Sequence, residues 1–185
     1  MAAAPRLLAR TTAYHHDSIP AAVTALRTLG LFEVTATEDP AAFERPLDDY
    51  AAVVFLSTSG EVLTSAGREH LAAHVESGGG FVGVHASACA EYDWPYYGDL
   101  LGARFDRHPA HQPGNAVIED RTHPATQHLP AVWQFTDEWY DFRTGPRSST
   151  HVLLSADESF YEDPDFRAYL LGGINWAARP GTSGE

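Results

Sequence analysis

The first half of the chain alternates short apolar runs with stretches of helical periodicity. Strands are predicted at residues 6–10, 32–37, 52–56 and 81–84. The run 52–56 is apolar at every position, which is typical of a central parallel strand that is covered on both faces. Between these runs the pattern predicts a helix from Ser18, its expected cap, to Gly30, and a second helix from Thr64 to Gly78.

The order of these elements favours parallel crossover connections: strand, helix, strand, short helix, strand, helix, strand. The predicted fold is therefore α/β, with a doubly wound, mainly parallel sheet and helices on both faces, as in flavodoxin-like proteins. After Trp94 the periodicity weakens; it predicts strands at 115–118 and 151–154 and a closing helix at 166–177. We expect one domain over residues 1–185, with a core at 6–177 and a tail at 178–185.

The charge balance narrows the range of partners. The 185 residues include 12 Lys and Arg against 25 Asp and Glu, which gives a formal net charge of −13. This charge repels phosphate backbones and anionic lipid, so neither nucleic acid nor a membrane is an expected partner. Cys89 is the single cysteine and cannot form an internal disulfide, and neither a secretion signal nor a spanning segment is evident. The sequence therefore predicts a cytoplasmic protein.

A ligand site is expected at the carboxyl ends of the parallel strands, because loops and helix N-termini converge there. Three segments meet this criterion: residues 11–17, 57–60 and 85–93. His85 follows a buried strand directly and precedes three small residues, which is the position of a nucleophile elbow in related architectures. It could act as a general base or a metal ligand, or it could simply bond the backbone at a strand end.

Further candidates surround this histidine. We expect His16, before the first helix, and Glu138, the best carboxylate candidate, to act with His85 in catalysis. Carboxylates mixed with stacking aromatic side chains are typical of sugar sites, although the same aromatics could instead pack on a core. The expected substrate-binding residues are His15, Ser57, Thr58, Glu91, Tyr92, Asp93, Trp94, His108, Gln112, Trp139 and Tyr140.

The sequence leaves a metal site open. His16, His85, His108 and Glu138 could together bind a divalent metal, but their spacing matches no diagnostic ligand motif. No cofactor is therefore established, and the identity of a metal stays unknown.

Several runs match a known family in order and spacing. They are His16-Asp-Ser-Ile-Pro20, Val54-Phe-Leu-Ser-Thr58, Gly78-Gly-Gly-Phe-Val-Gly-Val-His-Ala86, Glu91-Tyr-Asp-Trp-Pro95, His108-Pro109 with Gln112, Asp137-Glu-Trp-Tyr140 and Leu170-Leu-Gly-Gly-Ile174. Over residues 6–177 the chain resembles the ThuA-like (trehalose utilisation) family of the class I glutamine amidotransferase-like superfamily. The resemblance implies that superfamily's fold and a role in carbohydrate metabolism. It also puts His85 where an amidotransferase has its cysteine, so glutamine hydrolysis is not expected.

One departure from the family pattern lies near the C-terminus. The resemblance implies an Asp-His-Pro motif, a strand and a Gly-His turn before the last helix, whereas here Tyr161-Glu162 runs directly into Asp163-Pro164. A sheet without this strand has an unpaired edge, which invites another chain. We therefore expect a homodimer.

The leading hypothesis is a hydrolase-like enzyme that acts on a sugar or a glycoside-related small molecule. In this hypothesis His85 or Glu138 moves a proton while Tyr92, Trp94 and Trp139 stack on the ring. Because the Gly-His segment is missing, two alternatives stay open: a non-catalytic sugar-binding or regulatory protein, and a divergent biosynthetic enzyme.

Overall fold

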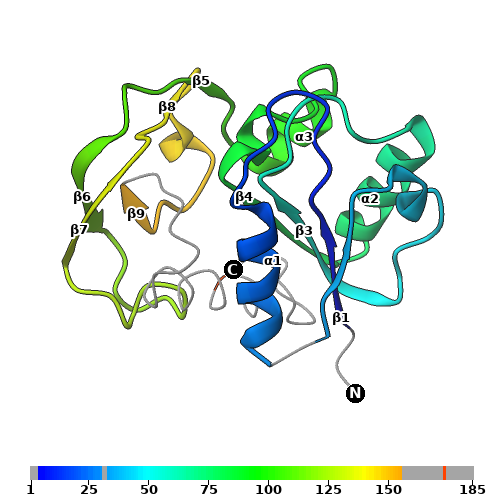
Figure 1. The fold of residues 1–185 in the computed structure, drawn as a ribbon, viewed down its shortest axis with the longest axis horizontal. Helices are drawn as coiled ribbons and strands as arrows, with labels where there is room; N and C mark the ends of the chain where they lie inside the picture. Colours follow the sequence, from blue (N-terminus) through cyan, green and yellow to red (C-terminus); the bar gives the residue numbers. More distant parts are fainter. Residues whose placement is uncertain (1–3, 31–32, 156–172, 174–185) are drawn as a thin grey trace.

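A four-stranded parallel sheet forms one half of the molecule. The computed structural model describes residues 4–30, 33–155 and 173. The sheet contains β1 (Ala4–Leu8), β2 (Thr35–Thr37), β3 (Tyr50–Leu56) and β4 (Gly80–Val84) in the order β2-β1-β3-β4, and every neighbouring pair is parallel (Figure 1). Each strand overlaps a predicted run, although β2 covers only the second half of its run.

Helices connect these strands as the sequence pattern predicts. The crossovers are α1 (Ile19–Thr28), the 3-10 helix η1 (Pro40–Phe43) and α2 (Ser65–Glu76). The Thr64 hydroxyl caps α2 by accepting a hydrogen bond from the Gly67 backbone N–H at 3.1 Å. The predicted cap of α1 is wrong, because Ser18 has helical backbone angles and makes no side-chain capping bond. No helix in the described part of the chain is long and apolar enough to cross a membrane.

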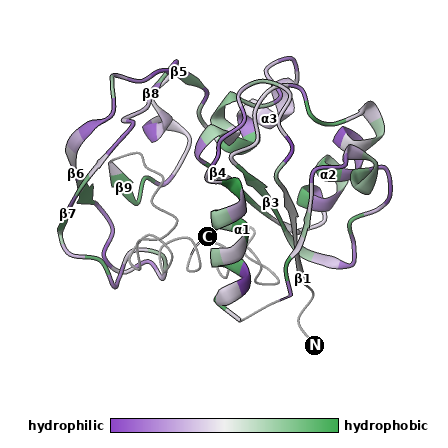
Figure 2. Cartoon of the chain, viewed as in Figure 1, coloured by the Kyte–Doolittle hydropathy of each residue, from purple (hydrophilic) through white to green (hydrophobic). Residues whose placement is uncertain are grey.

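Strand β3 is buried on both of its faces, as its apolar run predicts. Val54 and Leu56 pack in one cluster with α1, whereas Val53 and Phe55 pack in a second cluster with α2 and α3 (Pro95–Leu101). Figure 2 shows the hydrophobic colouring of β3 between these helices. Helices therefore cover both faces of the parallel sheet and hold its strand ends in place.

The second half of the chain forms two small antiparallel sheets. In one sheet β5 (Phe105–Arg107) pairs with β8 (Asp141–Phe142); in the other, β6 (Gln112–Ile118) lies between β7 (Val132–Asp137) and β9 (Leu154–Ser155). The strand predicted at 115–118 is found within β6, and the one predicted at 151–154 overlaps β9 only at its end. Because these strands are antiparallel, the expected mainly parallel sheet is limited to four strands in the described part of the chain.

Both halves contribute to one apolar core. Ala116 and Ile118 of β6 and Trp133 of β7 belong to the same buried cluster as α1 and β4. Figure 1 shows α1 between the antiparallel strands and the parallel sheet. The helix predicted at 166–177, apart from Gly173, and the junction at 162–163 lie outside the described residues.

Candidate functional site

The loops that follow β1, β3 and β4 are joined by backbone pairing. Thr11 forms a parallel bridge with Ser59, and Gly60 forms another with Ala90. Gly60 has a φ of +80°, and a Cβ there would lie 2.2 Å from Thr12 Oγ1, so glycine suits this close approach. The three segments predicted to surround a ligand therefore converge at one edge of the sheet.

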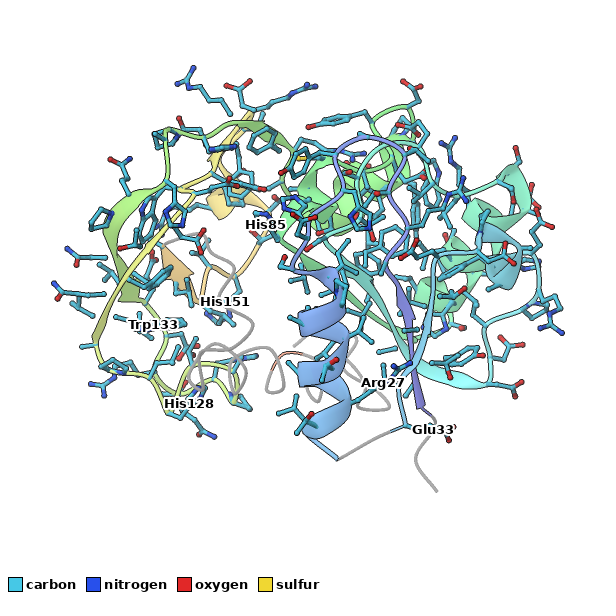
Figure 3. All side chains as sticks on the ribbon, in the orientation of Figure 1. Arg27, Glu33, His85, His128, Trp133 and His151 are labelled. Atoms are coloured by element: carbon cyan, nitrogen blue, oxygen red, sulfur yellow. The ribbon has the colours of Figure 1, made fainter. Side chains whose placement is uncertain are left out.

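His85 occupies a strained turn directly after β4. Its φ is 51°, in the left-handed region that non-glycine residues seldom adopt, and Ser57 after β3 has a φ of 50°. The Ser57 backbone N–H donates to the Val84 carbonyl at 3.1 Å and ties the two strand ends together. The 3-10 helix η2 (His85–Cys89) begins at this turn, which confirms the expected strand-to-helix elbow. Figure 3 shows His85 where the parallel half of the molecule faces the antiparallel half.

The His85 side chain is buried but incompletely bonded. Only 3% of its surface is exposed, and its Nε2 lies 3.2 Å from the Tyr140 hydroxyl and 3.9 Å from Glu138 Oε2. Its Nδ1 is buried without a hydrogen-bond partner among the described residues. In one tautomer Nδ1 carries an N–H donor and in the other a lone-pair acceptor. Either group is left without a hydrogen bond here, at a cost of about 1–3 kcal/mol. An unsatisfied buried group of this kind calls for a functional explanation.

Burial keeps His85 uncharged at neutral pH. Loss of solvation lowers the pKa of His85 from 6.5 to about 3, and the nearby His16 and His108 add smaller effects in the same direction. The ring centroids of His16 and His85 are 4.4 Å apart, and burial lowers the pKa of His16 as well. At pH 7 the elbow therefore presents a neutral imidazole, which can donate or accept a hydrogen bond.

Glu138 and His108 form the solvent side of the site. Their side chains are 31% and 35% exposed, and Glu138 Oε2 lies 3.8 Å from His108 Nε2. His108 Nδ1 lies 2.7 Å from the Pro109 carbonyl and donates to it, so in the neutral ring the acceptor nitrogen Nε2 faces Glu138. We refer to the five residues His16, His85, His108, Glu138 and Tyr140 as the His85 cluster.

The arrangement of these donors does not form a metal centre. In the part of the chain that the structure describes, no group of three or more His, Cys, Asp or Glu side chains is placed to hold an ion. Glu138 Oε2 lies 3.9 Å from His85 Nε2.

Glu91, an expected substrate-binding residue, lies fully buried beneath the loops. Its Oε1 accepts hydrogen bonds from the backbone N–H groups of Val62 and Leu63 at 2.7 and 2.8 Å, and its Oε2 accepts one from Arg68 Nε at 2.7 Å. The Arg104 guanidinium donates to the Glu91 carbonyl at 2.8 Å. The expected contact between Glu91 and a substrate is wrong, because this carboxylate has no exposed surface and holds the loop after β3 in place.

The three residues that follow Glu91 make their described contacts outside the His85 cluster. The Tyr92 hydroxyl donates to the Phe105 carbonyl at 2.9 Å. Trp94 stacks on Tyr96 with ring centroids 5.3 Å apart, while Asp93 is exposed. The alternative of aromatic packing on a core therefore describes Trp94 better than the expected stacking on a sugar.

His15 precedes His16 in the chain, whereas Ser57 and Thr58 lie in the loop after β3, next to the end of β4. Ser57 and Thr58 are fully buried, so the substrate contact expected of them would require the loop to move. His15 is exposed and lowers the pKa of its neighbour His16 further. Of these three expected residues, only His15 presents surface to a ligand.

Trp139 is held beside the cluster by a bond to the backbone. Its Nε1 donates to the Gln112 carbonyl at 3.0 Å, and its indole stacks on Phe135 with ring centroids 5.2 Å apart. A Cβ at Gly114 would lie 1.9 Å from the indole, so this glycine makes room for the ring. Gln112 therefore contributes its carbonyl to the site, rather than the side chain that was expected to bind substrate.

Three residues that support the cluster are not among the site residues predicted from the sequence. Asp137 is buried, and its Oδ1 accepts a hydrogen bond from the Glu138 backbone N–H at 2.7 Å. Phe105 packs edge-on against Tyr140 with ring centroids 4.5 Å apart, and Tyr14 packs against His16 at 4.7 Å. Only Asp137 has a signal in the sequence, its place in the Asp-Glu-Trp-Tyr run.

Comparison with known proteins agrees with this architecture. A family model described as "Trehalose utilisation", ThuA, matches residues 7–163. A solved structure from Bacteroides uniformis, described as thua-like, is similar with a TM-score of 0.79 at 21% identity, covering 98% of this chain and 94% of that chain. Another thua-like protein, from Parabacteroides merdae, has a TM-score of 0.81 at 16% identity, covering 100% and 93%. At these identities the likeness shows a shared fold. No curated protein matches the sequence.

Proposed function

Because the chain belongs to the ThuA (trehalose utilisation) family, we propose that it is an enzyme of carbohydrate metabolism, acting on a sugar-like small molecule at the His85 cluster. One observation carries this proposal. His85 is a neutral, buried imidazole at a strained elbow, with Nδ1 unpaired among the described residues and Nε2 3.2 Å from the Tyr140 hydroxyl. Strained backbone and strongly shifted pKa values concentrate at functional sites.

Glu138 is the group that exchanges a proton with the substrate. Its carboxylate is partly exposed, so a substrate oxygen or a water molecule can approach it, while His85 lies behind it. His108 Nε2 lies 3.8 Å from Glu138 Oε2 on the solvent side of the site. The hydrogen bond between neutral His85 and the Tyr140 hydroxyl fixes the phenol at the edge of the site. A positioned proton donor or acceptor contributes about 10²–10⁴-fold to a rate.

The proposed reaction is hydrolase-like and uses one carboxylate with histidines. Glycosidases usually place two carboxylates on opposite sides of the bond that is broken. Here the neighbouring Asp137 is buried and its Oδ1 is bonded to the Glu138 backbone, so Glu138 acts without a second carboxylate from this segment. Thioester chemistry of the amidotransferase type is not proposed, because the elbow residue is His85 and not a cysteine.

We also propose that the four-stranded sheet is the centre of a doubly wound, flavodoxin-like architecture of the class I glutamine amidotransferase-like type. Support comes from the parallel order β2-β1-β3-β4 and from the helices that pack on both faces of β3. In such sheets the ligand lies outside the carboxyl ends of the strands, which is where the His85 cluster lies.

A non-catalytic sugar-binding or regulatory protein is the second candidate. The observation that favours it is the 3% exposure of the His85 side chain, because a ligand would meet Glu138 and His108 before it reached His85. Under this alternative a sugar binds at the same cluster and is released unchanged.

One experiment separates the two candidates. The full chain is incubated with monosaccharides, disaccharides and simple glycosides; binding is followed by thermal shift and conversion by NMR. We expect at least one compound to be bound and converted, and E138Q to slow conversion by about 100-fold or more while binding persists. Binding without any conversion by the unmodified protein would contradict the enzyme and support the second candidate. Conversion that is unchanged in E138Q would remove Glu138 from the mechanism.

A further inference from the structure

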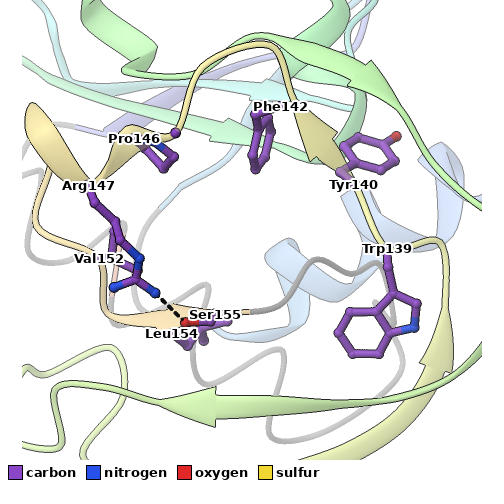
Figure 4. Close-up of a pocket in the computed structure, with 9 residues that line it drawn as sticks. Trp139, Tyr140, Phe142, Pro146, Arg147, Val152, Leu154 and Ser155 are labelled. Atoms are coloured by element: carbon purple, nitrogen blue, oxygen red, sulfur yellow. Dashed lines mark hydrogen bonds between the residues drawn. The ribbon is translucent and has the colours of Figure 1, made fainter.

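A pocket of about 470 Å³ lies on the far side of the Tyr140 ring from its hydroxyl (Figure 4). This volume is within the range of small-molecule sites. Its walls include the side chains of Trp139, Tyr140, Phe142, Pro146, Val152 and Leu154. Three of these six residues are aromatic, and the others are aliphatic or proline.

The pocket and the His85 cluster share one short segment of chain. Tyr140 contributes its ring to the pocket and its hydroxyl to His85, at 3.2 Å from Nε2. The preceding residue, Trp139, lines the pocket, and Glu138 before it faces His85 at 3.9 Å. The segment 138–140 therefore contributes to both sites, and the Tyr140 side chain belongs to each of them.

The polar side chains around the pocket already have partners within the protein. Arg147 donates to both carboxylate oxygens of Glu119 and, through Nη2, to the Ser155 hydroxyl at 2.9 Å. Ser155 in turn donates to Glu119. The Trp139 Nε1–H is taken by the Gln112 carbonyl. These groups carry no net charge as a set and offer little to the hydroxyl groups of a buried sugar ring.

Burying hydroxyl groups without hydrogen-bond partners is unfavourable, whereas an aromatic ring gains from stacking on Tyr140 and Phe142. We infer that the pocket binds an uncharged aromatic ring attached to the sugar, so that the natural substrate class is an aryl glycoside and not a disaccharide. This inference rests on the proposed function, since it names the group that adjoins the sugar at the His85 cluster.

The test compares methyl and phenyl glycosides of glucose, galactose and mannose, in both anomers, by isothermal titration calorimetry. For the best sugar we expect the phenyl glycoside to bind about tenfold or more tightly than the methyl glycoside. F142A should abolish that gain and leave the methyl affinity unchanged. V152T keeps the volume of the side chain but makes the pocket wall polar, so it should reduce the gain in affinity. It provides a second test of the pocket in case F142A does not fold. V132A is the matched control, because Val132 is an apolar residue of the same half of the molecule with 48% exposure.

Equal affinities for methyl and phenyl glycosides would overturn the inference. A gain in affinity that persists in both pocket variants would also contradict it, and so would tighter binding of trehalose than of any phenyl glycoside. If no glycoside binds, the proposed function fails separately, and saturation-transfer NMR with phenol then decides the pocket. A phenol signal that F142A and V152T both weaken would support aromatic binding there, and the absence of a signal would contradict it.

Discussion

The Tyr140 hydroxyl lies 3.2 Å from His85 Nε2, although the two residues are 55 positions apart in the chain. His85 is fixed by the end of β4, and Tyr140 by the segment that joins β7 to β8. This contact therefore joins the parallel sheet to the antiparallel half at the site where we propose that a sugar-like substrate is processed.

Loss of the Tyr140 hydroxyl should slow the reaction without removing the pocket wall. Y140F deletes the hydrogen bond to His85, which is worth about 1 kcal/mol, and we expect conversion to fall by about fivefold to tenfold. The aromatic ring stays, so the affinity for a phenyl glycoside should change little. Steady-state kinetics and calorimetry measure both effects. An unchanged rate would show that the hydroxyl does not support catalysis.

The stability of the protein should depend on pH through His85. The pKa of His85 is about 3 in the folded chain against 6.5 ordinarily, so between these values the unfolded chain binds more protons. Stability should therefore fall as pH decreases through this window, by at most about 1.4 kcal/mol per pH unit for this group. The lowered pKa values of His16 and His74 act in the same direction.

The comparison of H85N with the unmodified protein isolates this contribution. Denaturant unfolding at pH 7.5, 6.0 and 5.0 should give a flatter dependence on pH for H85N, since asparagine does not titrate. Parallel curves for the two proteins would show that His85 is not held neutral by burial.

Glu91 should matter for folding and not for ligand affinity. E91A leaves the N–H groups of Val62 and Leu63 and the Nε–H of Arg68 without their acceptor, and we expect a loss of about 3–5 kcal/mol of stability. D93A, which removes an exposed carboxylate two positions away, is the control and should change stability by less than about 0.5 kcal/mol. Unfolding curves give both values. A stable E91A protein with weakened sugar binding would contradict this prediction and indicate that Glu91 contributes to ligand binding.

A homodimer is proposed from the edge of the parallel sheet. Within the described residues β4 pairs with β3 alone, and an edge strand of this kind can pair with or lie against a second copy. Light scattering over a dilution series should give twice the mass of one chain at micromolar concentrations. A single-chain mass throughout would contradict the proposal.

Local sequence patterns predicted the parallel half of the fold. The all-apolar run 52–56 identified the central strand, and the small residues after His85 identified the elbow, since both follow from short-range sterics and burial. The antiparallel half was harder to predict, because β6 contains Pro113 and Gly114, which weaken a strand pattern.

The grouping of side chains near a strand end could be predicted from the sequence, whereas contacts that depend on a distant partner could not. His16, His85 and Glu138 come together because loops converge at the sheet edge. Glu91 is buried because it accepts hydrogen bonds from backbone N–H groups 28 and 29 residues away, and no local sequence pattern indicates such contacts. A single sequence likewise does not show that the Gln112 carbonyl would hold Trp139.

The most direct test of the central claim is the conversion rate of the best glycoside from the panel by H85N. Asparagine tolerates the left-handed φ of this elbow, so the variant should fold. The control is H128N, because His128 is an exposed histidine that lies far from His85 (Figure 3). We predict that H85N loses about 100-fold or more of the rate while H128N retains it. A rate in H85N equal to that of the unmodified protein would contradict the assignment of the site to His85.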